Sequence, residues 1–258
     1  MTFDFDGKKY AQVSTHQKEW GARLIAELDI RGAEQILDLG CGDGALTKQL
    51  ATLVPEGRVI GVDASQGMID VANARTVGNL SFILMDINEW TLADHFDLIF
   101  SNATLHWIVD HRRLLANVYA HLRQSGVARF NFAGEGNCSN FFRVVKEVMT
   151  QDQYPTYFEG FGWPWFMPSV EEYESILADS PFRHVSVWGE NADRSFPSAE
   201  ALVGWIDQPS LVPFLKQIGG SDKSGFRDAV VERMLQQTAQ DDGTYLETFR
   251  RINVLVKR

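Results

Sequence analysis

Three glycines and the acidic residues near them are the part of this sequence best suited to binding a ligand. Gly40, Gly42 and Gly44 follow a short apolar run, and Asp63 ends the next apolar run along the chain. A glycine turn lets backbone approach a ligand closely, and the N-terminus of a following helix offers free N–H donors. An acidic side chain at the end of the next strand can bind the hydroxyls of a ribose. The spacing therefore predicts a ligand that contains a nucleoside.

The charges around the glycine turn bear on which nucleoside that is. The run from Gly40 to Ala45 also satisfies the dinucleotide pattern G-x-G-x-x-A. A dinucleotide would bring its pyrophosphate close to Asp38 and Asp43, and unit charges a few Å apart repel each other by about 1–4 kcal/mol at a protein surface. S-adenosylmethionine brings an ammonium and a sulfonium instead, which acidic residues attract. The charges favour this methyl donor, with an NAD-binding oxidoreductase as the alternative.

Strands that alternate with helices place these residues at one edge of a sheet. Such an alternation predicts a parallel sheet with right-handed crossovers, and ligands bind beyond the carboxyl ends of its strands. Asp63, Asp86 and Asn102 each fall at such an end. The expected strands are 36–39, 58–62, 80–85, 96–100 and 127–132, and the expected helices are 11–28, 45–53, 66–74 and 111–122.

The second half of the chain has a less regular pattern. It predicts strands at 183–190 and 245–256 and helical stretches at 141–149, 169–179, 197–218 and 222–239. We expect a single α/β domain over 1–258: a Rossmann-like, doubly wound, mainly parallel seven-stranded sheet with a helical lid. The expected core covers about 30–133, 183–190 and 245–256, and the expected lid covers 1–28, 134–180 and 197–240.

Composition limits the classes of partner. The formal net charge of -10 argues against broad electrostatic binding to nucleic acid or to anionic membrane. No apolar run reaches the roughly 18 residues of a membrane span, and the first ten residues lack the apolar centre of a signal peptide. Cys41 and Cys138 are the only cysteines, so we expect a reducing cytoplasm, no disulfide framework and no metal site. We further expect a monomer or a weak homodimer.

Four motifs in order resemble those of the class I S-adenosylmethionine-dependent methyltransferases. They are the segment 38–44, Asp63, Asp86 and the segment 96–102, and the likeness extends from residue 10 to about 132. The resemblance implies S-adenosylmethionine as cofactor, with the ribose on Asp63 and the adenine amino group at Asp86. The donor-binding positions that it implies are Tyr10, Gln17, Asp38, Gly40, Gly42, Asp63, Ala64, Met68, Asp86, Ile87 and Asn102. Three residues of these motifs have structural alternatives: Gly44 could serve close helix packing, Asp86 could cap a short helix, and Asp63 could be a turn residue after a strand.

Two further stretches resemble a narrower group. The run 102–111 is similar to the segment after strand four in trans-aconitate, malonyl-carrier-protein and juvenile-hormone-acid methyltransferases, which methylate a carboxylate oxygen. Residues 10–17 resemble the helix start that these enzymes fold over the donor, and the tail 242–258 is most like the trans-aconitate group. This resemblance implies that Gln17 and Trp107 form walls around the donor and the acceptor carboxylate.

A carboxylate acceptor makes few chemical demands, because it is already a nucleophile at neutral pH and needs no general base. Catalysis is then alignment of oxygen, methyl and sulfur together with exclusion of water. Gln17 would hold the carboxylate through its amide N–H, and Trp107 would shape the pocket floor. His106 becomes a catalytic base only in the alternative of a C-, N- or hydroxyl O-methyltransferase. A non-catalytic S-adenosylmethionine-binding protein is the alternative of another class.

A carboxylate substrate should also meet a cation, and the lid should contribute to its pocket. The arginines considered for this contact are Arg143, Arg194 and Arg227 in the expected lid, and Arg129, Arg250 and Arg251 near strand ends. The aromatic residues of the expected lid either line an apolar acceptor pocket or form a packed core of the lid. They are Tyr154, Tyr157, Phe158, Phe161, Trp163, Trp165 and Phe166.

Overall fold

The computed structural model describes residues 15–151 and 153–258, and these divide into two compact units. The first unit contains the described residues up to 135 together with 165–190 and 251–258, and the second contains the described residues of 136–164 and 191–250. Most of the expected lid belongs to the second unit, but the expected lid residues 15–28, 134–135 and 165–180 belong to the first. Within the described ranges, no helix has the length and apolar character needed to cross a membrane.

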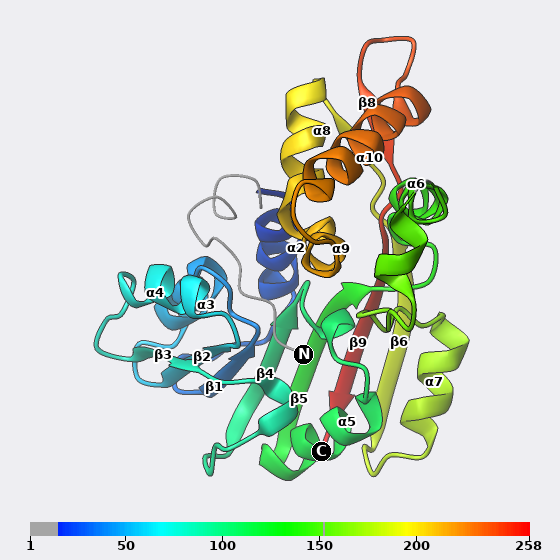
Figure 1. Ribbon diagram of the computed structural model, residues 1–258. Helices are drawn as coiled ribbons and strands as arrows, with labels where there is room; N and C mark the ends of the chain where they lie inside the picture. The colour runs from blue at the N-terminus through cyan, green and yellow to red at the C-terminus, as the bar shows by residue number, and fades with distance from the viewer. Residues whose placement is uncertain (1–14, 152) are drawn as a thin grey trace. The chain divides into compact units, whose positions relative to one another are not determined.

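The first unit is organised around a seven-stranded sheet (Figure 1). Its strands lie side by side in the order β3 (Leu80–Leu84), β2 (Arg58–Asp63), β1 (Gln35–Leu39), β4 (Phe96–Asn102), β5 (Leu122–Ala133), β9 (Arg250–Lys257) and β6 (His184–Asn191). The first five strands are parallel, and β9 runs antiparallel to β5. The predicted Rossmann-like, mainly parallel seven-stranded sheet is confirmed. The strand order reverses between β1 and β4, which is where open α/β sheets bind their ligands.

Apolar side chains on both faces of the strands explain why helices cover both sides. In β1, Ile36 packs in one cluster with Leu24 and Leu50, whereas Leu37 packs in the opposite cluster with Leu114 and Tyr173. Buried parallel strands show this two-sided apolar pattern because the crossover helices cover both faces. The helices of the first unit are α2 (Thr15–Ala26), α3 (Ala45–Leu53), α4 (Gln66–Asn73), α5 (His111–His121) and α7 (Val170–Ala178).

The prediction of one terminal strand over 245–256 is wrong. Tyr245–Glu247 forms β8, which pairs with β7 (Arg194–Phe196) in a separate two-stranded sheet, and only β9 joins the main sheet. Thr248 lies between the two strands, and its carbonyl oxygen accepts a hydrogen bond from the backbone N–H of Cys138 at 2.8 Å. The residue that separates the two strands thus has a hydrogen-bond partner distant in the sequence. The apolar pattern alone does not predict that the segment divides there.

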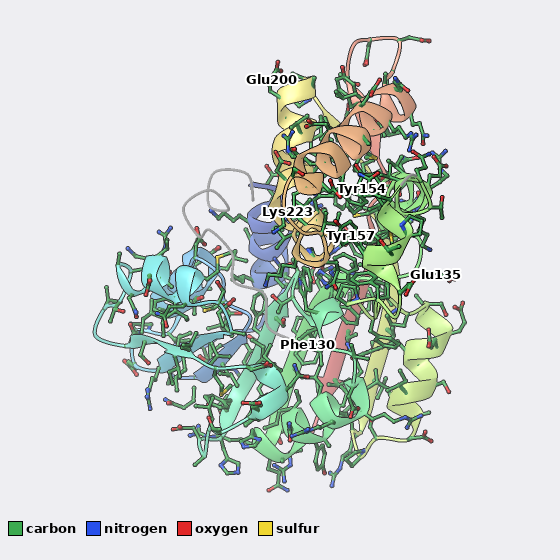
Figure 2. All side chains as sticks on the ribbon, in the orientation of Figure 1. Phe130, Glu135, Tyr154, Tyr157, Glu200 and Lys223 are labelled. Carbon is green, nitrogen blue, oxygen red and sulfur yellow. The ribbon has the colours of Figure 1, made fainter. Side chains whose placement is uncertain are left out.

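The second unit is mainly helical and has an aromatic core of its own. Phe214 packs against Phe158 and Phe161, and Tyr154 packs against Phe226 at 5.1 Å between ring centroids. Figure 2 labels Tyr154 and Tyr157 among the helices of this unit. These ring contacts support the packed-core alternative for the aromatic residues of this unit. Its helices are α6 (Ser139–Met149), the 3-10 helix η3 (Tyr154–Phe158), α8 (Ala199–Trp205), the π-helix η4 (Ile206–Ser210), α9 (Val212–Gln217) and α10 (Asp222–Thr238).

Candidate functional site

The glycine turn joins β1 to α3 at the carboxyl edge of the sheet. The backbone N–H groups of Gly40 and Cys41 donate to the carbonyl oxygen of Val62 at 2.8 and 2.9 Å, which ties the turn to β2. Gly40 and Gly42 have positive φ angles of 74° and 54°. A Cβ added to Gly40 would lie 2.1 Å from the Thr104 side chain, whereas one added to Gly42 would meet nothing within 4 Å. The turn is thus tightly packed against Thr104 at Gly40, whereas at Gly42 its backbone faces open space.

Gly44 serves packing. A Cβ added there would lie 2.6 Å from the Phe82 ring and 3.1 Å from the side chain of Ala72 on α4. This contact agrees with the structural alternative given for Gly44, in which its small size lets the turn pack closely.

Asp63, at the end of β2, links the glycine turn to the next loop. Its Oδ2 accepts a hydrogen bond from the backbone N–H of Gly42 at 2.9 Å, and its Oδ1 accepts one from that of Ser65, also at 2.9 Å. Burial raises the pKa of this carboxyl group, although the backbone hydrogen bonds oppose that rise. Ala64 follows directly, and Met68 is buried in the first turn of α4, which Ser65 caps. The predicted donor residues Asp63, Ala64 and Met68 therefore lie on one continuous segment, which runs from the end of β2 into the first turn of α4.

Two acids beside the turn differ in their environment. Asp38 is 2% exposed and accepts a hydrogen bond from Thr47 Oγ1 at 2.7 Å, and burial raises its pKa to about 7. Asp43 forms ion pairs with Lys18 at 2.9 Å and Arg75 at 3.3 Å. The charge of Asp43 is therefore compensated within the protein. Asp38 and Asp63, and not Asp43, are the acidic residues that can attract a cationic ligand.

Asp86 and Ile87 follow β3 on the same edge. Asp86 Oδ1 accepts hydrogen bonds from the backbone and side-chain nitrogens of Asn88, both at 2.8 Å, and Asp86 caps the 3-10 helix η1 (Ile87–Glu89). Asp86 therefore caps this short helix, as the structural alternative predicted, and it does so through one carboxylate oxygen, Oδ1. Ile87 is buried beneath it.

Asn102 and Gln17 bring the end of β4 together with helix α2. Asn102 Nδ2 donates to the backbone carbonyl oxygen of Gln17 at 2.8 Å. The side-chain oxygens Asn102 Oδ1 and Gln17 Oε1 are both buried without a hydrogen-bond partner among the described residues. A buried polar atom without a partner costs about 1–3 kcal/mol, so two of them at one place indicate a ligand that donates hydrogen bonds.

His106 and Trp107 lie in the 3-10 helix η2 (Leu105–Trp107), which follows β4. Burial is the main cause that lowers the pKa of His106 to about 3, and the charge of Arg251 contributes. His106 Nδ1 is buried without a hydrogen-bond partner in the part of the chain that the structure describes. The Trp107 ring lies 5.7 Å from the His106 ring and 5.1 Å from that of Trp165, measured between centroids. The three rings form one aromatic cluster.

His111 has a structural role. It is the first residue of α5, and its ring nitrogens make hydrogen bonds with the Tyr173 hydroxyl at 2.9 Å and the carbonyl oxygen of Leu105 at 3.0 Å. Burial lowers its pKa to about 4. It thus holds η2 in place from the core.

The structure brings most of the predicted site residues to one edge and adds others. Tyr10 lies outside the described residues, while the other ten predicted donor residues lie near the carboxyl ends of β1 to β4, in the segments that follow these ends, or in α2. Thr104 was missed: its hydroxyl donates to the carbonyl oxygen of Gly40 at 3.1 Å and so braces the turn. The sequence predicts Arg251 only as one of six arginines that could contact a carboxylate substrate. Its Nε and Nη2 donate to Asn131 Oδ1 at 2.8 and 2.6 Å, and its guanidinium lies 4.6 Å from the Trp20 ring centroid.

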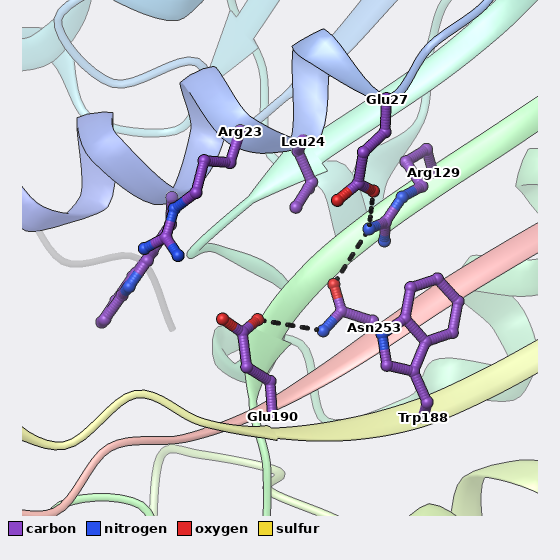
Figure 3. Close-up of a pocket in the computed structure, with 8 residues that line it drawn as sticks. Arg23, Leu24, Glu27, Arg129, Trp188, Glu190 and Asn253 are labelled. Carbon is purple, nitrogen blue, oxygen red and sulfur yellow. Dashed lines mark hydrogen bonds and ion pairs between the residues drawn. The ribbon is translucent and has the colours of Figure 1, made fainter.

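A separate cavity of about 180 Å³ lies between α2 and the strands β5, β9 and β6 (Figure 3). Across it, Arg129 donates to Glu27 at 2.8 Å and to Asn253 at 3.1 Å, and Asn253 donates to Glu190 at 3.3 Å. This chain of contacts fastens α2 to the sheet. Trp20 lines the cavity, but none of the predicted donor residues does.

Comparison with known proteins places this geometry in a family. The family model of the methyltransferase domain matches residues 36–126, which span β1 to the start of β5. A trans-aconitate 2-methyltransferase of Deinococcus radiodurans is 32% identical over 236 residues, covering 88% of each chain. The chain belongs to the class I S-adenosylmethionine-dependent methyltransferases.

A second relative and a solved structure are also similar to this chain. A trans-aconitate 2-methyltransferase of Acidovorax ebreus is 27% identical over 257 residues, covering 99% of this chain and 98% of the relative. The solved structure of phosphoethanolamine N-methyltransferase 2 from Haemonchus contortus, in complex with phosphomonomethylethanolamine and S-adenosylhomocysteine, shares the fold with a TM-score of 0.61. That pair is 21% identical, and the match covers 97% of this chain and 56% of the other.

The cofactor of this methyltransferase is S-adenosylmethionine, and the residues at the sheet edge fit it. The open space at Gly42 admits a ligand against the backbone of the turn. The unpartnered oxygens of Gln17 and Asn102 suit an ammonium, which has only hydrogen-bond donors to offer. The raised pKa of Asp38 marks a carboxyl group whose ionisation a nearby cation would favour.

Proposed function

We propose that this methyltransferase transfers a methyl group to a carboxylate oxygen of a small organic acid, either an acid like trans-aconitate or a more apolar one. When bound, S-adenosylmethionine supplies the methyl group from its sulfonium. Relatives named trans-aconitate 2-methyltransferase, which match this chain over nearly its full length, support the choice of acceptor. A cytoplasmic location and a monomer or weak homodimer stay predictions.

On the donor side, we assign the residues by the contacts that each can still make. Asp63 would bind the ribose hydroxyls, since its carboxylate oxygens retain acceptor capacity beside the two backbone N–H groups that they hold. Asp86 has one oxygen beyond its capping contact for the adenine amino group, and Ile87 would pack beside the ring. Gln17 Oε1 and Asn102 Oδ1 would accept from the ammonium of the methionine part, above Gly40 and Gly42.

On the acceptor side, the residues align the carboxylate and exclude water. The amide nitrogen of Gln17 would donate to the acceptor carboxylate while its oxygen binds the donor, so one side chain would contact both reactants. Trp107, packed against Trp165, would close the pocket with apolar surface. A water-poor pocket removes the hydration shell that a carboxylate has in solution, which favours attack by its oxygen.

The observation that carries the proposal is the state of His106. Its pKa of about 3 means that the ring is neutral at physiological pH and binds a proton weakly. An acceptor that must lose a proton, such as a hydroxyl group or an ammonium, would gain little from so weak a base. A carboxylate needs no base at all. The low pKa of His106 therefore favours carboxyl methylation over the alternative of a C-, N- or hydroxyl O-methyltransferase that uses His106.

Isotope transfer to a panel of acceptors tests the proposal. The protein is incubated with methyl-labelled S-adenosylmethionine and a set of mono-, di- and tricarboxylic acids, alcohols, phenols and amines. We expect labelled methyl esters, which mild base hydrolyses, from at least one class of acid and none from the same mixture with Asp63→Ala. Labelled products that all resist base would contradict carboxyl methylation.

A further inference from the structure

Thr104 lies at the junction between the glycine turn and the short helix η2, which contains His106 and Trp107. It follows the last residue of β4 by two positions and directly precedes η2. Its side chain contacts Gly40 in the glycine turn, and its carbonyl oxygen accepts a hydrogen bond from the backbone N–H of Trp107 at 2.9 Å. One residue therefore contacts both the segment that we place at the donor and the segment that we place at the acceptor.

The hydroxyl of Thr104 is directed to the glycine turn and not to its own helix. A threonine at the start of a helix commonly accepts a hydrogen bond from a backbone N–H two or three residues later. Thr104 makes no such capping contact with η2. Its hydroxyl donates instead to the carbonyl oxygen of Gly40 at 3.1 Å, and the carbonyl oxygen of Asn102 lies at 3.3 Å. Because a hydroxyl has a single hydrogen to donate, these two carbonyl groups share it.

The backbone just before Thr104 has an uncommon conformation. Ala103 has a φ of 59°, and its N–H donates to the carbonyl oxygen of Asn131 at 2.7 Å. Residues other than glycine adopt this left-handed conformation at a cost in free energy, and such residues cluster at functional sites. The strained residue lies between two residues that contact other parts of the site, Asn102 at α2 and Thr104 at the glycine turn.

The glycine turn does not depend on Thr104 for its own conformation. The backbone N–H groups of Gly40 and Cys41 both donate to the carbonyl oxygen of Val62, at 2.8 and 2.9 Å. These contacts come from β2, so they remain when the Thr104 hydroxyl is removed. What the hydroxyl adds is a direct contact between the turn and the start of η2. Its loss should therefore leave the donor site formed and change the position of η2 relative to that site.

Ser101 makes a matched hydrogen bond next to that of Thr104. Its hydroxyl donates to the carbonyl oxygen of Leu39 at 2.7 Å, and Leu39 directly precedes Gly40. Ser101 is fully buried and lies within β4, whereas Thr104 follows the strand. Both hydroxyls thus connect this segment to consecutive carbonyl groups at the end of β1. Of the two, the Thr104 hydroxyl is the one that belongs to the start of η2.

Methyl transfer is sensitive to the distance between the donor methyl group and the acceptor oxygen. A displacement of about 1 Å can lower the rate of such a reaction by about 100-fold, because the reacting atoms must be aligned at close range. We propose, on the basis of the proposed function, that Thr104 is a positioning residue whose hydroxyl sets the separation between the donor at the glycine turn and the acceptor beside Trp107. It acts through Gly40 and η2, without contact with the reacting atoms.

The test compares the rate of methyl transfer with the affinity for the donor product. Single-turnover rates are measured for wild type, Thr104→Val, Thr104→Ser and Ser101→Ala with the organic acid that the wild type methylates best. Thr104→Val places a methyl group against the carbonyl oxygen of Gly40, so we expect the rate to fall by about tenfold. The dissociation constant for S-adenosylhomocysteine, measured by calorimetry, should change by less than about threefold. Thr104→Ser keeps the hydroxyl and should react within about threefold of the wild-type rate.

Two controls separate this result from a general loss of structure. Ser101→Ala removes the matched hydrogen bond, so we expect a lower melting temperature and an unchanged rate. If Thr104→Val does not fold, Thr104→Ala, which removes the hydroxyl without adding a methyl group at the carbonyl oxygen, takes its place. The assignment is overturned by an unchanged rate in the Thr104 variant, by an equal loss in Ser101→Ala, or by a donor affinity that falls by the same factor as the rate.

A measurement without turnover separates failure of the inference from failure of the proposed function. The indole N–H signal of Trp107 in a nitrogen–proton NMR spectrum, assigned with Trp107→Phe, should shift when S-adenosylhomocysteine saturates wild type or Thr104→Ser. In Thr104→Val the shift should be clearly smaller, because the turn and η2 are no longer joined. Equal shifts, or no shift in wild type, overturn the inference. A wild type that methylates no acid overturns carboxyl methylation, and the indole signal then decides the role of Thr104.

Discussion

The donor side and the acceptor side of this methyltransferase are built in different ways. The proposed donor side comes from consecutive strand–turn–helix units, in which the glycine turn, Asp63 and Asp86 each lie at or just after the end of a strand. The proposed acceptor side combines Gln17 on α2 with His106 and Trp107 on η2. Local geometry creates the first, whereas the folded sheet must assemble the second from distant segments. Substitutions on the two sides should therefore affect different steps.

The largest effect should come from Asp63, which serves the donor side alone. Asp63→Ala removes the proposed ribose contact and also releases the backbone N–H groups of Gly42 and Ser65. We expect the dissociation constant for S-adenosylhomocysteine to rise by about 100-fold or more, since two charge-assisted hydrogen bonds are lost. Calorimetric titration measures this, with Asp63→Asn, which keeps one acceptor oxygen, as an intermediate. Unchanged binding by Asp63→Ala would show that the ribose lies elsewhere.

Gln17 is proposed to contact both the donor and the acceptor. Its substitution should therefore affect turnover more than donor binding. Gln17→Ala removes the amide that we place between both reactants, so kcat should fall by about 10- to 100-fold through loss of alignment. The affinity for S-adenosylhomocysteine should fall by only about threefold, the effect of one neutral hydrogen bond. Single-turnover rates and calorimetry on the same preparation give the two values. If both fall by the same factor, Gln17 has no role at the acceptor.

Asp38 should make donor binding depend on pH. Its pKa of about 7 in the folded protein means that the carboxyl group is largely protonated at pH 6 and largely ionised at pH 8. A cationic donor favours the ionised form, so binding releases a proton, and the affinity for S-adenosylmethionine should rise about tenfold from pH 6 to pH 8. Asp38→Asn should flatten this rise, because the amide has no charge to gain. A wild-type affinity that falls over the same range would contradict the placement of the cation near Asp38.

The smallest effect should come from His106, because the acceptor needs no base. Glutamine can still donate a hydrogen bond in place of the imidazole, so His106→Gln should change kcat by less than about threefold, against about 100-fold or more for loss of a catalytic base. The wild-type pH–rate profile at saturating substrates should also lack a step near pH 6.5, since the pKa of His106 is about 3. A loss of 100-fold with a product that resists base would restore the base alternative.

The contrast between the two sides also explains what the sequence could reveal. The order of strands and turns fixes which residues reach the carboxyl edge, and for this reason the glycine turn, Asp63, Asp86 and Asn102 were predictable from spacing. The neutralisation of Asp43 was not predictable from spacing, because its two ion-pair partners come from other parts of the chain: Lys18 from α2 and Arg75 from the segment after α4. The position of Arg251 depends on an antiparallel register between β5 and β9, which no local pattern encodes.

The terminal segment shows the same limit in the fold. Residues 245–256 are apolar enough for one strand, yet the chain divides them between two sheets. Glu247 is fully buried, and its carboxylate accepts hydrogen bonds from the backbone N–H groups of Asn140 at 3.2 Å and Phe141 at 2.9 Å, at the start of α6. A carboxylate at a helix N-terminus is a favourable arrangement, but only the tertiary fold brings the two together.

A crystal structure with bound S-adenosylhomocysteine tests the central claim most directly, because it fixes both sides at once. We expect ribose hydroxyls within hydrogen-bond distance of Asp63 and a sulfur atom that faces the wall formed by Gln17 and Trp107. A ribose away from Asp63, or a sulfur that faces away from Gln17 and Trp107, would contradict the account.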